Sequence, residues 1–495
     1  MPPSAQRKTE LPNPVLPGFY PDPSLCRVGE HYYLANSTFE YLPGIPIHES
    51  TDLRTWRSLG AAITRPEKFD LGNARDSGGI YAPTIRYHDG RFYVVGSQVD
   101  HRPETQFIIS AADPAGPWTS PIWVADADGF DPSVFFHDGT AYWCAARILD
   151  PGQYEGQTAI WVREIDMATG LFTGPETVVW GGALRGDTWS EGPHIFEREG
   201  WFYLLTAEGG TYRDHAVMIA RSRSVTGPYE NCPRNPIISH RHLGDRHPVQ
   251  NVGHADFVQR TDGSWAAALL GVRTENGRHI LGRETFVADV VWEHGWPVVN
   301  PGVGMLTAVG ERTCAWELEP ARVAGALSVR GDARFAAETT TGVVLSASAN
   351  RGRPSALFYR LAHHRAQLLV TFDAVEPGAA VGLALRQSDS YSIRLEIDGR
   401  RVGIIERAAD VDIERDHWTL SDDAPLEIVA ETTASSVCFR VGERCSSAVD
   451  ASVLSSETAG GFVGTVWGPY VAGAAGAQAR LRRIAYSDRE MSEQL

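Results

Sequence analysis

Hydrophobic and polar residues follow a pattern that recurs five times in the first three hundred residues of the chain. Each copy opens with a short motif, which contains proline in four of the five, and continues with a β-favouring run, a turn that carries glycine and an aromatic-rich run. Two apolar runs joined by such a turn predict a β-hairpin. The copies are DPSLCRVGEHYYLANS from Asp22, APTIRYHDGRFYVVGS from Ala82, DPSVFFHDGTAYWCAA from Asp131, GPHIFEREGWFYLLTA from Gly192 and ADFVQRTDGSWAAALL from Ala255.

The spacing of these copies predicts the architecture. The second residues of the five motifs lie 60, 49, 61 and 63 residues apart, at Pro23, Pro83, Pro132, Pro193 and Asp256. Each interval holds four short strands with their loops, and all-β repeats of this size are typical of propeller blades. A solenoid is the alternative, but these intervals are too long and uneven for a β-helix. We therefore expect a five-bladed β-propeller over residues 1–310.

The pattern changes after Trp296. Residues 297–310 are rich in Pro and Gly, and we expect residues 311–324 to form a linker or a docking segment. From residue 325 onward, short runs such as AQLLVTF, VGLALRQ and YSIRLEID follow one another at regular intervals. This pattern predicts a β-sandwich over residues 325–490. No segment in either half reads as a long helix, so the predicted fold class is all-β.

Composition and charge exclude some classes of partner. The 495 residues suffice for two or three domains, and 45 Lys and Arg against 61 Asp and Glu give a net charge of −16. This balance argues against nucleic acid and membrane surfaces, because both select a basic face. The six cysteines form no CxxC pair, and residues 1–14 hold no apolar signal-peptide core. We therefore expect a reduced, cytoplasmic protein.

The starts of the five repeats carry the candidate chemistry. The innermost strand of each propeller blade lines the central channel, so these starts should converge on one funnel. Three of them bring a carboxyl group, Asp22, Asp131 and Glu191, and the fifth brings His254. Burying like charges together raises the pKa of at least one group, which is how a general acid arises near neutral pH. Asp before Pro also starts many turns, but three acids at matching repeat positions favour function.

Two carboxyl groups that flank an anomeric carbon are the apparatus for cleaving a glycosidic bond. Phe39, Tyr81 and Phe130 offer flat apolar surfaces for a sugar ring, although core packing explains most aromatic residues of a propeller. Arg283 is a lone basic residue in an apolar strand, and its guanidinium suits a sugar hydroxyl, a carboxylate or a structural salt bridge. His254 could be a hydrogen-bonding pillar, a metal ligand or a substrate contact.

Several longer motifs run in order through the first half of the chain. They are NPVLPGFYPDPS (13–24), STFEYLPGIPIHESTDLRTW (37–56), GGIYAPTIRYHDGRFYVV (78–95), GFDPSVFFHDG (129–139), SEGPHIF (190–196), LLTAEGGT (204–211), NVGHADFV (251–258), LGRETF (281–286) and GWPVVNPG (295–302). Together they resemble glycoside hydrolase family 43, in particular its two-domain β-xylosidases and α-L-arabinofuranosidases. The resemblance also implies that the C-terminal sandwich is concanavalin A-like.

The resemblance implies an inverting mechanism and a role for each acid. Asp22 would be the general base that activates water, Glu191 the general acid, and Asp131 the group that orients the acid and tunes its pKa. Arg283 would contact the sugar in subsite −1, and His254 matches a histidine that binds calcium in some relatives. No other cofactor is implied. The remaining substrate contacts would be Phe39, Tyr81, Phe130, Thr211 and Phe462, the last of them a sandwich-loop residue that closes the pocket.

One departure from the family pattern bears on the sugar. Many β-xylosidase-like members have Trp where this chain has Tyr81, and the smaller ring favours a furanose over a xylopyranose. The STFEYLPG and TAEGGT stretches also resemble the arabinofuranosidase branch. We therefore expect exo-acting release of terminal α-L-arabinofuranose from neutral pentose-containing oligosaccharides, with β-xylosidase or dual activity as the alternative. A homo-oligomer is compatible with the sequence.

Two further hypotheses compete with this one. A retaining, invertase-like fructosidase would use an Asp nucleophile, and the anomer of the released sugar would distinguish it. A non-catalytic sugar-binding propeller would bind without turnover, which the intact set of three acids argues against. A protein-binding scaffold has no need of converging carboxyl groups.

Overall fold

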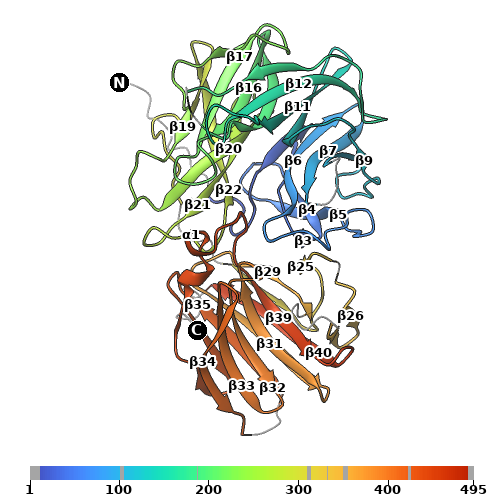
Figure 1. Ribbon diagram of the computed structural model, residues 1–495, viewed down its shortest axis with the longest axis vertical. Coiled ribbons are helices and arrows are strands. Elements are labelled where there is room, and N and C mark those ends of the chain that lie inside the picture. Colours follow the sequence, from blue (N-terminus) through green and yellow to red (C-terminus); the bar gives the residue numbers. More distant parts are fainter. Residues whose placement is uncertain are drawn as a thin grey trace.

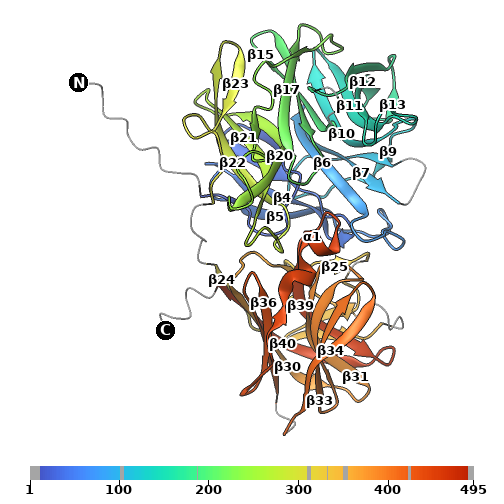
Figure 2. The same ribbon diagram turned by 60° about the vertical axis from the view of Figure 1, so that its left-hand side comes forward.

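The computed structural model describes residues 12–100, 105–184, 186, 188–308, 314–331, 333–348, 355–421 and 425–488. The chain forms a propeller and a sandwich, one above the other in Figure 1, with helix α1 (Ser456–Ala459) at their junction in the turned view of Figure 2. This four-residue segment is the one α-helix in the described part of the chain, which confirms the all-β prediction. The expected limits at residues 1, 310 and 490 lie outside the described residues.

Each predicted repeat opens one antiparallel blade of the propeller, and its hairpin supplies the first two strands. Blade one runs β1 (Ser24–Val28), β2 (His31–Ala35), β4 (Gly44–Ser50), β5 (Arg57–Ile63), and blade two β6 (Gly79–His88), β7 (Arg91–Val99), β8 (Gln106–Ala111), β9 (Ile122–Trp123). Blade three runs β10 (Phe130–His137), β11 (Thr140–Ile148), β12 (Thr158–Asp166), β13 (Leu171–Phe172), with β14 (Thr177–Trp180) also on β12. Blade four runs β15 (Glu191–Arg198), β16 (Trp201–Glu208), β17 (Ala216–Ser222), β18 (Glu230–Asn231), with β19 (Ile238–Ser239) also on β17. Blade five runs β20 (Val249–Gln259), β21 (Trp265–Arg273), β22 (Glu284–Glu293), β23 (Trp296–Val299).

The blades close into a ring because each first strand contacts the first strands of both neighbouring blades, and β20 of blade five contacts β1. Side chains on the two faces of a strand alternate, so every blade presents one apolar face to each neighbour. Five separate apolar clusters result, one in each gap between adjacent blades. Trp143 and Trp161, for example, are fully buried between blades two and three.

Buried polar contacts fasten the gap where the ring closes. The Asn13 side chain donates to the Val287 carbonyl at 2.8 Å and accepts from the Val287 amide at 2.9 Å. The Asp256 carboxylate of blade five accepts from the Ser24 hydroxyl at 2.8 Å and pairs with Arg86 of blade two at 2.8 Å. Asp256 therefore joins three blades through one side chain.

The second unit is a two-sheet sandwich, as the sequence predicts. One sheet is ordered β26 (Ala336–Thr339), β27 (Gly342–Ser346), β40 (Gln478–Asp488), β30 (Ala366–Val375), β35 (Leu426–Thr432), β36 (Ser436–Val441), β37 (Arg444–Cys445), with β24 (Ala315–Leu318) on β40 and β38 (Val449–Asp450) on β36. The other is ordered β28 (Ser355–Ala356), β39 (Val466–Gly473), β31 (Ala379–Arg386), β32 (Ser392–Asp398), β33 (Arg401–Ala408), β34 (Val411–Thr419), with β29 (Tyr359–Arg360) on β39. The short helix η1 (Ala451–Leu454) precedes α1.

Pairing and buried charge hold the two units together. The segment expected as a linker or docking segment contributes β24 to the sandwich, and the following β25 (Ser328–Val329) pairs with β3 (Tyr41–Leu42) of the propeller. Arg386 of the sandwich is buried and donates to Glu40 at 3.3 Å and to Asp76 at 2.8 Å, both in the propeller. Arg330 also pairs with Asp76 at 2.8 Å. These contacts fix the sandwich against the propeller wall that borders the site.

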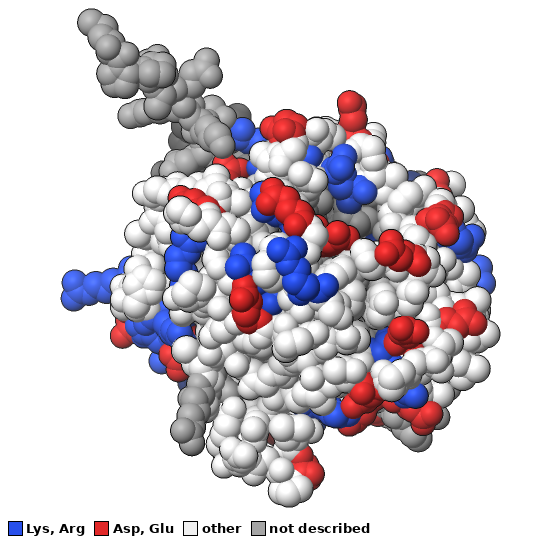
Figure 3. All heavy atoms as spheres, turned by 90° about the horizontal axis from the view of Figure 1, so that it is seen from above, with Lys and Arg blue, Asp and Glu red and all other residues white. Residues whose placement is uncertain are grey.

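Charged side chains are dispersed over the end of the propeller seen in Figure 3. Acidic and basic residues are interspersed among uncharged ones, and no broad basic area is visible among the described residues on this face. Of the helices that the structure describes, none has the length and apolar character needed to span a membrane.

We predict that Asp256→Ala lowers the free energy of unfolding by about 3 kcal/mol, because it leaves Arg86 without its buried partner. Calorimetric or urea unfolding measures the change. Glu319→Ala is the control, since it removes an exposed pair with Arg482 at 3.1 Å and should cost less than about 1 kcal/mol. Equal effects of the two substitutions would contradict the role of Asp256 in ring closure.

Candidate active site

In four of the five first strands, β6, β10, β15 and β20, a local break in the pairing register turns side chains toward the central channel. The pairing register shifts between Phe130 and Ser133 in β10 and between Glu191 and His194 in β15. Such β-bulges re-aim side chains and are common beside active sites. Asp131 in the β10 bulge and Asp22, two residues before β1, share one backbone conformation, each with a φ of 51°. In blade four Gly192 takes that position with a φ of 56°, so Glu191 stands one residue earlier than the other two acids.

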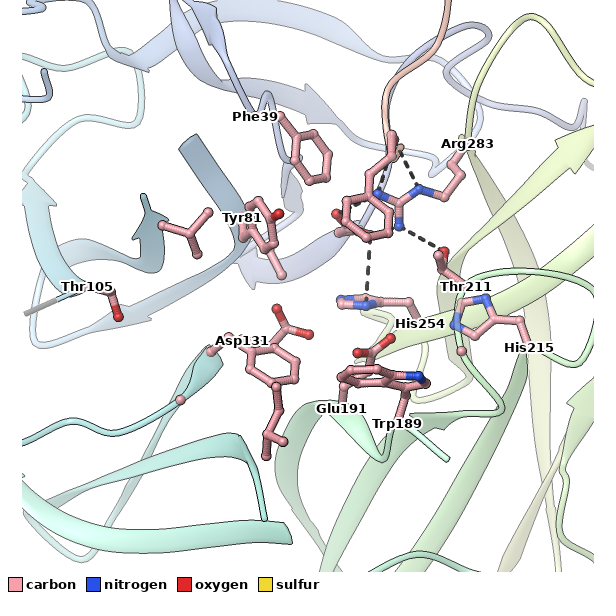
Figure 4. A pocket seen from close by; sticks show the side chains of 18 of the residues that line it. Phe39, Tyr81, Thr105, Asp131, Trp189, Glu191, Thr211, His215, His254 and Arg283 are labelled. Carbon is pink, nitrogen blue, oxygen red and sulfur yellow. Dashed lines mark hydrogen bonds and ion pairs between the residues drawn. The ribbon is translucent and has the colours of Figure 1, made fainter. Parts of the chain in front are cut away.

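The first strands frame a cavity of about 570 Å³ that brings together all ten residues singled out in the sequence (Figure 4). Three blades supply the carboxyl groups of Asp22, Asp131 and Glu191. The other seven are Phe39, Tyr81, Phe130, Thr211, His254, Arg283 and Phe462. The lining also contains residues that the motifs did not single out, among them Arg75, Ile148, Trp189, Tyr212 and His215.

Asp22 is held as a buried carboxylate. Its Oδ1 accepts from Arg283 Nη1 at 2.7 Å, and its Oδ2 accepts from the Ser37 hydroxyl at 2.6 Å. Burial opposes ionisation, but the Arg283 charge and the Ser37 hydrogen bond outweigh it, so the pKa of Asp22 lies below its usual value. The group is therefore a base with free lone pairs at neutral pH.

Asp131 and Glu191 have the opposite tendency. Burial and then the Asp22 charge raise the pKa of Asp131 to about 7. Burial, followed by the charges of Asp131 and Asp22, raises the pKa of Glu191 well above its usual value. The Gly192 amide donates to Asp131 Oδ2 at 3.1 Å and fixes that side chain next to the Glu191 backbone. The two groups form a coupled pair that keeps a proton near neutral pH.

Arg283 connects the acids to both units of the chain. Besides Asp22, its Nη1 reaches the Thr211 hydroxyl of blade four at 3.2 Å. Its Nε and Nη2 donate to the Phe462 carbonyl at 3.4 and 3.3 Å, so the sandwich helps to orient the guanidinium. The loop that carries Phe462 can come this close because Gly282 has no side chain. A Cβ at position 282 would lie 2.6 Å from the Gly464 Cα, a contact that only glycine avoids.

Three aromatic rings form one wall of the cavity. Phe39 lies 5.0 Å from Tyr81 and 5.9 Å from Phe462 between ring centroids. Ser77 ties this wall together: its carbonyl accepts from the Tyr81 hydroxyl at 2.8 Å, and its hydroxyl accepts from the Phe462 amide at 2.8 Å. The Tyr81 hydroxyl, expected from the sequence to alter the sugar-binding wall, therefore helps to hold the wall in place.

His254 lies beneath the acids, with its Nδ1 3.9 Å from Asp22 Oδ1. Burial lowers its pKa, so the ring is neutral at physiological pH. The His254 ring also accounts for the glycine at position 192, because a Cβ there would lie 2.8 Å from the His254 Cε1. No group of three or more His, Cys, Asp or Glu side chains is placed to hold a metal ion within the described ranges. Calcium takes six to eight oxygen ligands, and Asp22 is the one acidic side chain within ion-pair distance of His254 among the described residues. Calcium binding at His254 stays a prediction.

Some residues that line the cavity from loops lie outside the repeat motifs. Trp189 stands two positions before Glu191, and Tyr212 directly follows the LLTAEGGT motif. Their nearness to a motif is the one feature of the sequence that could have indicated their place in the cavity. His215 had none. Its Nδ1 lies 3.1 Å from the Asn251 carbonyl, and only the folded chain brings these residues together.

Comparison with known proteins agrees with this geometry. Residues 11–297 match the family model of glycosyl hydrolases family 43, and residues 343–482 match the model of a β-xylosidase C-terminal concanavalin A-like domain. A xylosidase/arabinosidase of Butyrivibrio fibrisolvens is 47% identical over 60% of this chain and 57% of its own length. A non-reducing end α-L-arabinofuranosidase of Bacteroides ovatus is 44% identical over 58% of this chain and 53% of its length. The chain thus aligns with little more than half of each of these relatives.

Two solved structures resemble the whole chain. A Bacteroides ovatus protein described as xyloglucan PUL GH43B has a TM-score of 0.86 at 31% identity, covering 97% of this chain and 99% of its own. A xylan β-1,4-xylosidase from Bacillus halodurans has a TM-score of 0.87 at 26% identity, covering 97% of this chain and 100% of its own. Because the first family model spans more than half of the 495 residues, this chain belongs to glycosyl hydrolases family 43.

Proposed function

We propose that this protein is an inverting, exo-acting glycoside hydrolase that releases a terminal pentose from neutral oligosaccharides, with α-L-arabinofuranose favoured. One observation carries the proposal. Asp22 is ionised while the pair of Asp131 and Glu191 keeps a proton, all in one cavity. A base and an acid that coexist at one pH are what single-displacement cleavage of a glycosidic bond requires.

In this mechanism the sugar lies between Asp22 and Glu191. Asp22 accepts a proton from a water molecule, whose oxygen attacks the anomeric carbon. Glu191 gives its proton to the glycosidic oxygen, which leaves with the rest of the chain as a hydroxyl group. Asp131 keeps the pKa of Glu191 high and orients it through the Gly192 segment, and Arg283 holds Asp22 in place.

Burial along the cavity supports removal of one terminal sugar. Asp22 and His254 are 4% and 6% exposed, whereas Ile148 and Tyr212 are 54% and 53% exposed. The cavity is therefore deep at the acids and open at the opposite end. Phe462 and Phe39 close the wall beside the acids, so a chain that continued past the bound sugar would meet this wall.

The sugar preference draws support from relatives and from one wall residue. Of the two relatives described above, one is named an α-L-arabinofuranosidase and the other a xylosidase/arabinosidase, a name that covers both candidate sugars. The Tyr81 ring is smaller than the Trp of many β-xylosidase-like members, which leaves room for a furanose ring. β-D-Xylosidase is the second candidate, because the matching C-terminal model and the Bacillus halodurans structure carry that name.

Rates of the Asp22→Asn and Glu191→Gln variants on aryl α-L-arabinofuranoside and aryl β-D-xylopyranoside test the site. Each variant should lose roughly a hundredfold or more in kcat/KM, because a positioned acid or base contributes that much. The exposed Asp126, outside the cavity lining, supplies the matched control Asp126→Asn, which should retain the normal rate. Near-normal rates in both site variants would refute the assignment of acid and base.

The first-formed sugar reveals the stereochemical course. Proton NMR during the first minutes of hydrolysis should show the anomer opposite to that of the substrate, because water attacks from the face opposite the leaving group. A product that retains the substrate anomer would replace the proposed mechanism with a covalent intermediate, as in the invertase-like alternative.

The value of kcat/KM should pass through a maximum and fall at both lower and higher pH. Activity is lost as pH drops through the lowered pKa of Asp22, below its usual 3.8, because the base becomes protonated. It is also lost as pH rises through the raised pKa values of the Asp131–Glu191 pair, because the acid loses its proton. Asp131→Asn removes a negative charge beside Glu191 and should move the alkaline limb to lower pH. An unmoved limb would show that Asp131 does not tune the acid.

A further inference from the structure

Ser77 connects two rings of the aromatic wall, although it is not among the residues that line the cavity. It is 6% exposed and has a φ of 57°, in a region that residues other than glycine adopt mostly where their surroundings impose it. Its hydroxyl and carbonyl hold Phe462 and Tyr81, as described above. Its amide donates to Glu40 Oε2 at 3.1 Å. Each polar group of Ser77 therefore has a partner, and the amide bond to Glu40 leads away from the cavity.

The partner of the Ser77 amide belongs to a buried charge cluster between the two units of the chain. Glu40 is fully buried, and its Oε1 accepts from Nη1 of the sandwich residue Arg386 at 3.3 Å. Burial raises the pKa of Glu40 to about 7, even though the Arg386 charge lowers it. Removal of Arg386 would therefore leave a proton on a carboxyl group whose two oxygens now both accept hydrogen bonds.

The same cluster holds the residue that precedes Ser77. Asp76 Oδ1 accepts from Arg386 Nη2 and from Arg330 Nη2, each at 2.8 Å. Asp76 Oδ2 accepts from the Asp389 amide at 2.9 Å, and the Asp389 carboxylate pairs with both arginines. Arg386 thus reaches Ser77 by two routes, through the residue before it in the chain and through the acceptor of its amide.

The Phe462 carbonyl extends these contacts to the proposed base. It accepts from Arg283 Nε and Nη2 at 3.4 and 3.3 Å, and Arg283 Nη1 donates to Asp22 Oδ1 at 2.7 Å. Figure 4 marks the contacts of the Arg283 guanidinium with dashed lines. A continuous series of contacts therefore joins the sandwich to Asp22. It runs from Arg386 through Ser77, Phe462 and Arg283.

We propose that Arg386 is a positioning residue for the reaction, which acts through Glu40 and Ser77 on the aromatic wall and on the base without touching the substrate. Its guanidinium lies at the junction of the two units and outside the cavity lining. The sandwich therefore does more than supply Phe462, because its buried charge fixes the backbone that holds the wall. This inference rests on the proposed function and adds how the second unit of the chain controls the site.

The test measures kcat/KM against pH for Arg386→Met, Glu40→Gln and Ser77→Ala on the aryl pentoside that the wild type cleaves faster. Each substitution should lower kcat/KM by roughly 10- to 100-fold, because a displacement of about 1 Å at the reacting groups costs that much. Each should also move the acidic limb of the profile to higher pH and leave the alkaline limb in place. Arg283 lowers the pKa of Asp22, so a displaced guanidinium lets burial raise that pKa, and the base is protonated at higher pH.

The other groups that face Asp22 lie outside the substituted positions. They are His254, His215, Asp131, Glu191 and the Ser37 hydroxyl. Burial lowers the pKa of both histidine rings, which are neutral over the range of the profile near neutral pH. A shift confined to the acidic limb therefore reports on the contact between Arg283 and Asp22.

The three substitutions differ in what they remove. Arg386→Met keeps the apolar stem and takes away the charge. Glu40→Gln keeps the size of the side chain, but its NH2 group must face a donor, either the Arg386 guanidinium or the Ser77 amide, so it decides the question if Arg386→Met fails to fold. Ser77→Ala leaves the Phe462 amide without its acceptor. Because all act by one route, the double variant of Arg386→Met and Ser77→Ala should lose no more than the stronger single variant.

Arg394→Met is the matched control. Arg394 lies on β32, which pairs with the Arg386 strand β31, and its ion pair with Asp412 at 2.9 Å stays within the sandwich. This variant should keep the wild-type kcat/KM and both limbs of the profile.

Two outcomes overturn the inference. Losses of kcat/KM without a shift of the acidic limb, or with an equal shift in Arg394→Met, would assign the cluster a purely structural role. Near-normal kcat/KM in Glu40→Gln and Ser77→Ala would remove the cluster from the reaction. In either case the wild type still cleaves the pentoside, so the proposed function stands. If the wild type cleaves neither aryl α-L-arabinofuranoside nor aryl β-D-xylopyranoside, the proposed function itself fails.

Discussion

The ion pair between Arg283 and Asp22 is the interaction on which the rest of the site depends. The 2.7 Å contact joins blade five to blade one deep inside the ring, and the same guanidinium reaches Thr211 of blade four and the Phe462 carbonyl of the sandwich. A buried carboxylate without this partner would take up a proton. Arg283 therefore keeps the base charged and also contacts the second unit of the chain.

The negative charge on Asp22 has consequences for its neighbours. Burial makes ionisation of Asp131 and Glu191 costly and the charge on Asp22 adds to that cost, so the pair retains a proton that it would lose in water. The three groups are chemically similar, but only Asp22 accepts a hydrogen bond from Arg283 among the contacts described above. This difference in surroundings separates a base from an acid within one cavity.

Backbone geometry at the blade starts places these groups. The backbone at Asp22, Asp131 and Gly192 has positive φ, which Asp tolerates and Gly adopts freely. In the same way, glycines at 282 and 464 let the sandwich loop approach, and glycines at 156 and 210 receive the Trp189 ring. The sandwich is therefore part of the cavity, since its Phe462 contributes a ring to the wall and a carbonyl that accepts from Arg283.

The sequence by itself determined the number of blades, the all-β class and the three acids, because hydrophobic alternation and turn residues are local signals that repeat with the fold. The alignment of the repeats placed Asp22 and Asp131 as equivalents and Glu191 one residue earlier, directly before Gly192. It did not reveal the bulges in β10 and β15, since a bulge leaves no mark in hydrophobic alternation. The family resemblance implied which acid is the base, but only the tertiary structure shows the burial and the Arg283 contact that separate the pKa values. It also brought Ser77, His215 and Trp189 to the site, because pKa values and loop contacts depend on groups that are distant in sequence and meet only when the ring and the sandwich close.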